Sequence, residues 1–190
     1  MADNEESSSS ASRKTKKHVC VIGAGASGLV VMKELTELGH SVECFEQLPV
    51  VGGAYVKAYP GAILTTSSLL TAFSFYSDGK EHQPKFWTAE EYIEYLTGFA
   101  KKYELYQYIS FLHSVELVKK CTTTGKWIVT VRGGQGCEGV TRCADVAADP
   151  SIESRTIAFD GIAVCTGIHT WVNIEQPDVY ICRSVCIPKL

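Results

Sequence analysis

A glycine-rich turn between an apolar run and a helical pattern constrains the fold of this chain more than any other feature. The glycines Gly23, Gly25 and Gly28 have the G-x-G-x-x-G spacing. His18–Ile22 before them predicts a buried parallel strand, and Ser27–Leu38 after them predicts a helix. The first glycine permits a tight turn, the second a close approach to a pyrophosphate, and the third close packing of helix on strand. The helix N-terminus then offers N–H groups and a positive dipole end to phosphates.

A second strand and an acidic residue complete this unit. Ser41–Phe45 predicts the strand, and Glu46 follows it at the position where such folds place a ribose-binding acid. A carboxylate there accepts hydrogen bonds from both ribose hydroxyls and disfavours a 2′-phosphate. The ligand predicted from these residues is therefore FAD or NAD rather than NADP.

The same glycine spacing occurs again at Gly134, Gly136 and Gly139. This copy also follows an apolar run, Trp127–Val131, but residues 140–149 after it have no sustained helical period. We interpret the second copy as a glycine-rich hairpin or loop, and only the first as a dinucleotide site.

Composition and charge narrow the classes of function. With 190 residues, 45% of them apolar, the chain can bury one substantial core, with room for an appendage. A net charge of −3 gives no electrostatic case for nucleic acid or an anionic membrane. No apolar run approaches the length of a membrane span. We therefore expect neither a nucleic-acid partner nor a membrane segment.

The eight cysteines of the chain indicate its compartment. The acidic, Ser-rich start has no signal-peptide pattern, and Cys20, Cys44 and Cys165 lie within apolar, strand-like runs where a free thiol acts as a small hydrophobe. We expect a reducing compartment and a cytoplasmic protein. Cys182 and Cys186 lack the second pair that a zinc site needs, so no metal site is predicted.

The chain divides into a tail, one domain and a second tail. Residues 1–17 are polar and Ser-rich and predict a disordered tail. Residues 18–175 form the predicted domain, and residues 176–190 form an atypical C-terminal tail. Within the domain, Gly52 and Gly53 lie in a loop where paired glycines permit close contact with a ligand.

An aromatic helix follows a segment rich in Ser, Thr and aromatic residues. Thr88–Glu91 has the capping-box pattern, and the positions after it recur at helical spacing. These positions, which we interpret as core, are Tyr92, Ile93, Leu96, Phe99, Ala100 and Tyr103. Residues 59–78 before them either pack over a flat ring system or fill the core, and the sequence leaves both interpretations open.

The remaining strands indicate an antiparallel insertion in a parallel fold. The predicted strands of the insertion are Tyr108–Val118, Lys126–Arg132 and Arg155–Phe159. Ile162–Cys165 predicts a returning parallel strand. Thr166–Gly167 follows at its carboxyl end, where open α/β sheets place ligands.

In this order, the segments resemble the N-terminal FAD half of a flavin-containing monooxygenase. The resemblance covers residues 17–173, and its most telling parts are Cys20–Leu35, Phe45–Tyr55, Phe86–Leu105 and Phe159–Thr170. It implies an α/β fold: an incomplete, Rossmann-like FAD-binding domain in three layers, with a parallel sheet and an antiparallel β insertion.

The resemblance also assigns roles to residues. The glycine turn would hold the FAD pyrophosphate, and Glu46 with Gln47 would hold the FAD ribose. The second glycine loop would lie against the flavin, and Thr166–Gly167 would close the domain. The cofactor-binding residues implied in this way are Gly23, Gly25, Ala26, Ser27, Gly28, Glu46, Gln47, Gly52, Gly53, Tyr55, Thr166 and Gly167.

The chemistry implied is that of the family. NADPH reduces FAD, oxygen is captured as a flavin C4a-hydroperoxide, and one oxygen atom passes to a soft nucleophile, nitrogen or sulfur, of a small molecule. The cofactor carries the difficult step, and the protein keeps the site dry and places the nicotinamide. The cofactors expected are FAD and NADPH, the partner is the small-molecule substrate, and the oligomeric state is left open.

The chain departs from the family pattern in three ways. Tyr55 stands where the family usually has Trp, which keeps a ring. Thr66 aligns with the active-site Asn; a Thr donates one hydrogen bond but lacks the second group of the amide, so Thr66 is the candidate catalytic residue with altered stabilisation. Family members are more than twice as long, and neither their second glycine motif for NADPH nor their F-x-G-x-x-x-H motif is present.

We therefore interpret the chain as truncated, through a truncated gene model, a frameshift or an unspliced intron, because residues 179–190 do not resemble the family. On its own it is expected to bind FAD weakly or not at all and not to oxidise NADPH. The alternatives are an inactive nucleotide-binding remnant, a Baeyer–Villiger-type monooxygenase and another FAD oxidoreductase. An amine oxidase usually has Arg after its Gly-Gly loop, where Ala54–Tyr55 stand here, and the C-x4-C of disulfide reductases is absent.

Overall fold

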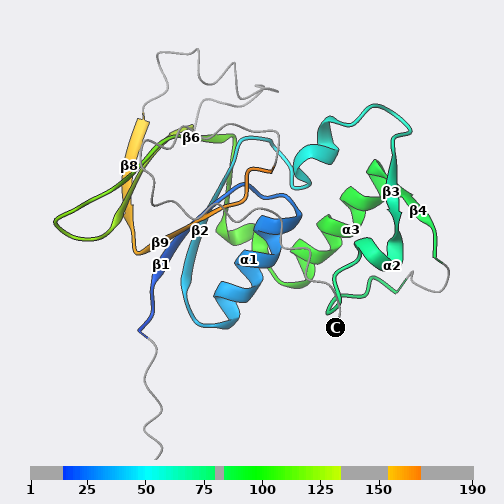
Figure 1. The fold of residues 1–190 in the computed structure, drawn as a ribbon, viewed down its shortest axis with the longest axis horizontal. Coiled ribbons are helices and arrows are strands. Elements are labelled where there is room, and N and C mark those ends of the chain that lie inside the picture. The colour runs from blue at the N-terminus through cyan, green and yellow to red at the C-terminus, as the bar shows by residue number, and fades with distance from the viewer. Residues whose placement is uncertain (1–14, 80–83, 134–153, 168–190) are drawn as a thin grey trace, which may run out of the picture.

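The centre of the fold is a parallel sheet of four strands, ordered β5-β2-β1-β9 (Figure 1). The computed structural model describes residues 15–79, 84–133 and 154–167. The sheet consists of β1 (His18–Ile22), β2 (Ser41–Glu46), β5 (Ile109–Phe111) and β9 (Gly161–Val164). Both neighbours of β1 run parallel to it, so the predicted returning strand is confirmed. The central strand β1 is apolar from Val19 to Ile22, as expected for a strand that is covered on both faces.

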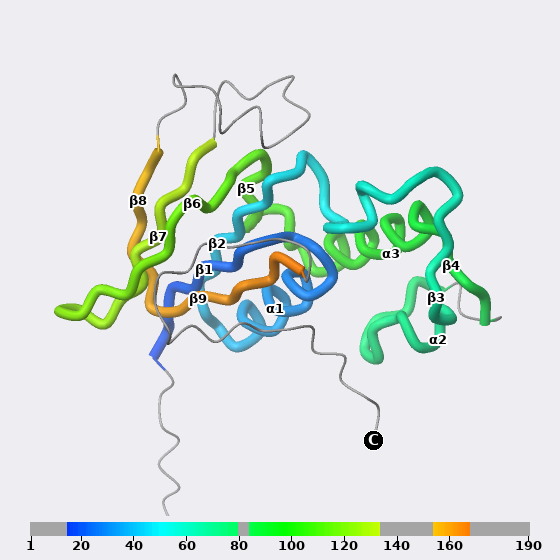
Figure 2. Tube along the Cα trace, turned by 45° about the horizontal axis from the view of Figure 1, so that its top comes forward, coloured from blue at the N-terminus to red at the C-terminus, as the bar shows by residue number. Residues whose placement is uncertain are grey.

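A helix, α1 (Ala26–Glu37), covers one face of this sheet, and a second sheet covers the other (Figures 1 and 2). A further helix, α3 (Ala89–Lys102), packs beside α1. The second sheet consists of β6 (His113–Lys120), β7 (Trp127–Gly133) and β8 (Ser154–Phe159) in antiparallel order. Because strand side chains alternate, Val21 and Cys44 face the helices. Cys20 and Phe45 pack against the antiparallel sheet. The three-layer α/β fold with an antiparallel insertion is confirmed.

The start of α3 has the predicted capping box. The Thr88 hydroxyl accepts a hydrogen bond from the Glu91 N–H at 3.2 Å, and the Glu91 carboxylate accepts one from the Thr88 N–H at 3.1 Å. These reciprocal bonds satisfy donors that the first turn of a helix otherwise leaves without a partner. The helix therefore begins where the sequence predicts.

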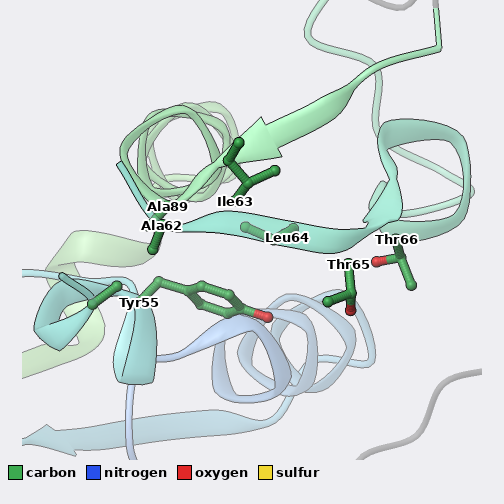
Figure 3. A pocket seen from close by; sticks show the side chains of 8 residues that line it. Tyr55, Ala62, Ile63, Leu64, Thr65, Thr66 and Ala89 are labelled. Atoms are coloured by element: carbon green, nitrogen blue, oxygen red, sulfur yellow. The ribbon is translucent and has the colours of Figure 1, made fainter. Parts of the chain in front are cut away.

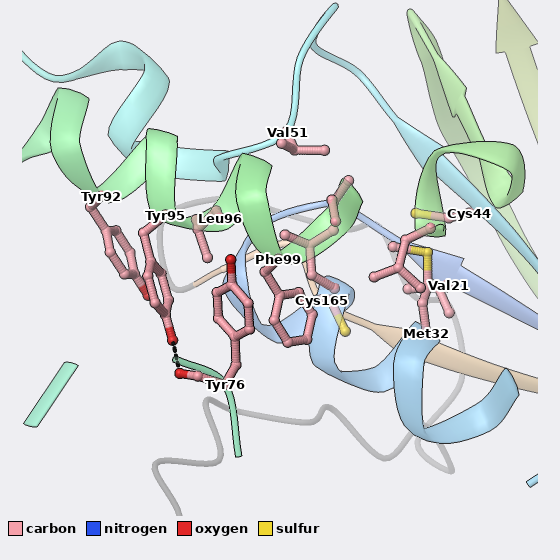
Figure 4. Close-up of a cluster of buried hydrophobic side chains, with 14 of the residues drawn as sticks. Val21, Met32, Cys44, Val51, Tyr76, Tyr92, Tyr95, Leu96, Phe99 and Cys165 are labelled. Carbon is pink, nitrogen blue, oxygen red and sulfur yellow. Dashed lines mark hydrogen bonds between the residues drawn. The ribbon is translucent and has the colours of Figure 1, made fainter. Parts of the chain in front are cut away.

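An aromatic cluster fixes α3 to the rest of the core (Figure 4). Tyr92 and Phe99 from the predicted stripe are buried, as is Tyr95, which the stripe omitted. The Tyr95 hydroxyl accepts a hydrogen bond from the Phe73 N–H at 2.8 Å and donates one to the Tyr76 carbonyl at 3.2 Å. The stripe is thus core, and Tyr95 secures the segment that precedes α3.

That segment, residues 59–78, fills the core in part and lines a cavity in part. It follows η1 (Gly53–Lys57) and contains β3 (Ile63–Ser67) and α2 (Ser68–Thr71), and β3 pairs antiparallel with β4 (Phe86–Thr88). Figure 2 shows β3, α2 and β4 beyond α3, on the side away from the antiparallel sheet. Leu64 and Tyr76 are buried in the core, whereas the exposed side of β3 lines the cavity.

The single strand predicted for Tyr108–Val118 is wrong. Tyr108 ends the short helix η2 (Leu105–Tyr108), and the next three residues form β5 in the parallel sheet. Leu112 then turns the chain with a φ of 56°, and β6 of the antiparallel sheet begins at His113. The apolar pattern continues through this turn without Gly or Pro, so no residue type marks the break.

Three predictions fall wholly or largely outside the described residues: the disordered tail 1–17, of which only 15–17 are described, the loop of Gly134, Gly136 and Gly139, and the tail 176–190. In the parts of the chain that the structure describes, no helix has both the length and the apolar character needed to cross a bilayer.

Candidate cofactor-binding site

The predicted glycine turn lies at the carboxyl edge of the parallel sheet, between the ends of three strands. The Gly23 N–H donates to the Phe45 carbonyl of β2 at 2.9 Å, and the Cys165 N–H after β9 donates to the Ile22 carbonyl at 2.8 Å. Gly23 has a φ of 100°, and a Cβ there would lie 2.7 Å from the Cys165 carbonyl oxygen. Only glycine fits this turn, and the geometry brings Thr166–Gly167 beside it.

The start of α1 is open toward this edge. Gly25 is its N-cap, no side chain caps the helix, and no acidic residue lies in the first turn, which begins with Ala26 and Ser27. A Cβ on Gly28 would lie 1.9 Å from the Gly23 carbonyl oxygen, so the helix packs directly on the turn. An uncapped helix start with positive dipole is suited to bind an anion.

The second glycine loop closes over the first. The Gly52 N–H donates to the Ala24 carbonyl at 3.2 Å. The Gly53 Cα lies 3.5 Å from the position that a Cβ on Gly25 would take. Gly52 and Gly53 have φ values of 131° and 60°, which favour glycine. The two loops therefore meet backbone to backbone and form a narrow cradle at the helix start.

Glu46 ends β2 as a buried carboxylate, 4% exposed, that holds the cradle together. Its Oε2 accepts a hydrogen bond from the Ala24 N–H at 2.6 Å, and its Oε1 accepts one from the Leu48 N–H at 2.8 Å. Each oxygen keeps acceptor capacity for a further donor, such as a ribose hydroxyl. Burial raises the pKa of Glu46, and the N–H groups of Ala24, Leu48 and Gln47 partly oppose this rise.

Glu46→Gln is expected to change how stability depends on pH. Because the folded-state pKa of Glu46 is raised above its ordinary value of 4.5, the folded chain holds this proton more tightly than the unfolded chain. The stability from protonated Glu46 is present below about pH 4.5 and is lost as pH rises through the folded-state pKa. The free energy of unfolding of Glu46→Gln, relative to wild type, should therefore rise in urea titrations as the pH is raised above 4.5.

Glu90→Gln is the control of opposite sign. The pKa of Glu90 is lowered by its own backbone N–H and by the Thr88 hydroxyl. The stability that Glu90 contributes is present above its unfolded pKa and lost as pH falls, so Glu90→Gln should lose stability relative to wild type as pH rises. A Glu46→Gln difference that stays constant with pH, or follows the Glu90→Gln trend, would contradict the burial of the Glu46 charge.

A cavity of about 290 Å³ adjoins the cradle (Figure 3). It is lined by Tyr55, Ala58, Ala62, Ile63, Leu64, Thr65, Thr66 and Ala89. Tyr55 follows Gly53 within η1, and its ring packs edge-on against Tyr92 with centroids 4.7 Å apart. The cavity thus brings together Tyr55 and Thr66, two of the predicted site residues. Thr65 beside them was missed, because its Ser/Thr-rich segment has no pattern that distinguishes one hydroxyl from the next.

The described cysteines and acids form no metal centre. Within the described ranges 15–79, 84–133 and 154–167, no group of three or more His, Cys, Asp or Glu side chains is placed to hold a metal ion. Cys20, Cys44 and Cys165 are buried and form no disulfide. Burial raises the pKa of the Cys20 and Cys44 thiols, as expected for thiols that serve as small core residues.

Comparison with known proteins connects this geometry to one family. Residues 16–179 match the FMO-like family, described as flavin-binding monooxygenase-like. The chain is 36% identical over 154 residues to 4-hydroxybenzoate brominase (decarboxylating) of Pseudoalteromonas luteoviolacea, covering 80% of this chain and 26% of the brominase. It is 33% identical over 168 residues to flavin-containing monooxygenase 5 of Mus musculus, covering 82% of this chain and 28% of that protein.

The fold has solved counterparts. The structure of S-allyl-L-cysteine S-oxygenase from Allium sativum matches with a TM-score of 0.66 at 22% identity, over 80% of this chain and 37% of that one. The chain spans less than a third of the length of the two curated relatives above.

Proposed function

The chain belongs to the flavin-binding monooxygenase-like family, and from this membership we propose that it is the FAD-binding part of an FAD- and NADPH-dependent monooxygenase. The reaction proposed is transfer of one oxygen atom to a soft nucleophile, nitrogen or sulfur, of a small molecule. The observation that carries the proposal is the cradle, in which the glycine turn, the uncapped start of α1 and the Glu46 carboxylate meet at one sheet edge.

The residues present fit the ADP portion of FAD. Ala26 and Ser27, in the first turn of α1, would hold the pyrophosphate through their backbone N–H groups. Glu46, with Gln47 beside it, would accept the ribose hydroxyls, because two backbone N–H groups already fix the carboxylate in place. Gly52 and Gly53 would lie against the ligand, because neither has a side chain to keep it away.

The cavity supports FAD rather than NAD as the resident ligand. Tyr55 of η1, directly after the second glycine loop, lines the cavity, and the lining has no charged side chain, which suits a flat aromatic ring. Tyr55 would flank this ring, Thr66 would face it, and Thr166–Gly167 would close the edge beside Gly23. Bound FAD supplies the redox chemistry that activates oxygen, with NADPH as its reductant.

Cys20 and Cys44, which are thiols and not disulfides, support a reducing, cytoplasmic location.

Ligand competition tests the proposal without requiring turnover. FAD is titrated into the purified chain and its fluorescence quenching is followed; ADP, FMN and NADP⁺ are then tested as competitors. Because the cradle grips the ADP portion, we expect ADP to displace FAD and FMN to bind at least about tenfold more weakly. NADP⁺ should compete poorly, because its 2′-phosphate meets the Glu46 carboxylate. FMN binding as tightly as FAD, or no displacement by ADP, would refute this assignment.

A further inference from the structure

Thr66 and Thr71 form a hydroxyl pair at the edge of the cavity. Their Oγ1 atoms are 2.6 Å apart, and this contact alone does not say which hydroxyl donates. Thr71, in α2, also donates to the Ser67 carbonyl at 3.0 Å. A hydroxyl has one proton. A carbonyl can only accept, so the one arrangement that keeps both bonds has Thr71 donating to the Ser67 carbonyl and Thr66 donating to Thr71.

The direction of this bond sets what Thr66 offers the cavity. With its proton given to Thr71, the Thr66 hydroxyl has only lone pairs left for a ligand. It can accept a hydrogen bond from a ligand N–H or O–H and cannot donate one. The reverse arrangement would give up the bond between Thr71 and the Ser67 carbonyl.

We propose that Thr71 is a positioning residue that turns Thr66 into a hydrogen-bond acceptor, so that the cavity selects ligand groups with a donor N–H or O–H at this point. Thr71 acts through Thr66 and does not line the cavity itself. The inference rests on the proposed function only in that FAD is the probe ligand. It makes Thr71, five residues after Thr66 in sequence, a determinant of the polarity of the site.

A double-mutant cycle tests this. Thr71→Val keeps the shape of the side chain, removes the acceptor and frees the Thr66 proton to turn into the cavity. We expect Thr71→Val to change the FAD dissociation constant about two- to tenfold and to shift the visible absorption spectrum of bound FAD. Thr71→Ser, which keeps the hydroxyl, should behave as wild type. In a Thr66→Val background, Thr71→Val should have no further effect.

Thr36→Val is the matched control. The Thr36 hydroxyl makes the same kind of bond to the carbonyl four residues earlier, that of Met32, at 2.9 Å, but in the last turn of α1. This variant should leave the FAD spectrum and affinity unchanged. If Thr71→Val has the same effect in the wild-type and Thr66→Val backgrounds, Thr71 does not act through Thr66 and the inference is wrong.

The same double-mutant cycle, measured by urea unfolding without FAD, separates the proposed function from the proposed role of Thr71. Thr66→Val and Thr71→Val should be non-additive in the free chain, because each removes the same bond; additive effects would overturn the pair. If wild type and every variant fail to bind FAD, the ligand part of this inference falls, whereas the proposed function does not, because the chain on its own is expected to bind FAD weakly or not at all. The unfolding cycle still decides whether the pair exists.

Discussion

Gly28→Ala is expected to lower the free energy of unfolding by about 3 kcal/mol or more, a large share of the roughly 5–15 kcal/mol typical of a domain. The added Cβ would lie 1.9 Å from the Gly23 carbonyl oxygen and 3.0 Å from its carbon. Both are backbone atoms, so no side-chain rotation relieves the contact. Relief requires α1 to move off the turn, which disturbs the packing of Leu29 and Met32, both fully buried. Urea unfolding followed by circular dichroism measures the loss.

Gly161→Ala is the matched control in β9 of the same sheet. Of the residues that the structure describes, a Cβ at Gly161 would meet the Val19 side chain alone, at 3.8 Å, which is ordinary contact. We expect this variant to stay within about 0.5 kcal/mol of wild type. Equal stability of Gly28→Ala and Gly161→Ala would show that α1 does not pack on the turn as described.

The parts of the fold that are predictable from sequence are those with local signals. The glycine spacing between an apolar run and a helical period defines β1 and α1, and Thr88 and Glu91 define the start of α3. The division between β5 and β6 has no such signal, because the residue that takes the left-handed conformation there is a leucine, Leu112, and not a glycine. The division is set by strand pairing, because β5 pairs with β2 and β6 pairs with β7. A local sequence pattern does not show which strands will pair.

In the candidate site, too, some residues are predictable from local motifs and their contacts are not. Motif spacing predicts Gly23, Gly25 and Glu46, but the partners of the Glu46 carboxylate are backbone N–H groups, which any residue other than proline supplies. The contact between Gly25 and Gly53 joins two loops that no local pattern connects. The hydroxyl network of the cavity depends on donor geometry in three dimensions, and residue types alone do not determine it.

Gly25→Ala is expected to separate binding from folding. Gly25 has a φ of −79° and an extended ψ of −171°, which alanine adopts freely. Its Cβ would meet the Gly53 Cα at 3.5 Å and the Gly53 nitrogen at 3.9 Å, both ordinary contacts. Stability should therefore stay within about 0.5 kcal/mol of wild type. The methyl group nevertheless adds bulk at the N-cap of α1, directly before the Ala26 and Ser27 N–H groups that we propose hold the pyrophosphate.

Loss of the phosphate contacts at the start of α1 should weaken FAD binding by about 1.5–3 kcal/mol, or roughly ten- to hundredfold. Fluorescence titration of FAD into Gly25→Ala measures this, with Gly161→Ala expected to bind as wild type does. Gly28→Ala also loses FAD, but through unfolding, so only the pair of glycine variants distinguishes a helix start that binds phosphate from one that merely packs. Wild-type affinity in a folded Gly25→Ala would mean that the pyrophosphate does not approach the backbone at Gly25, and the cradle would then be structural alone.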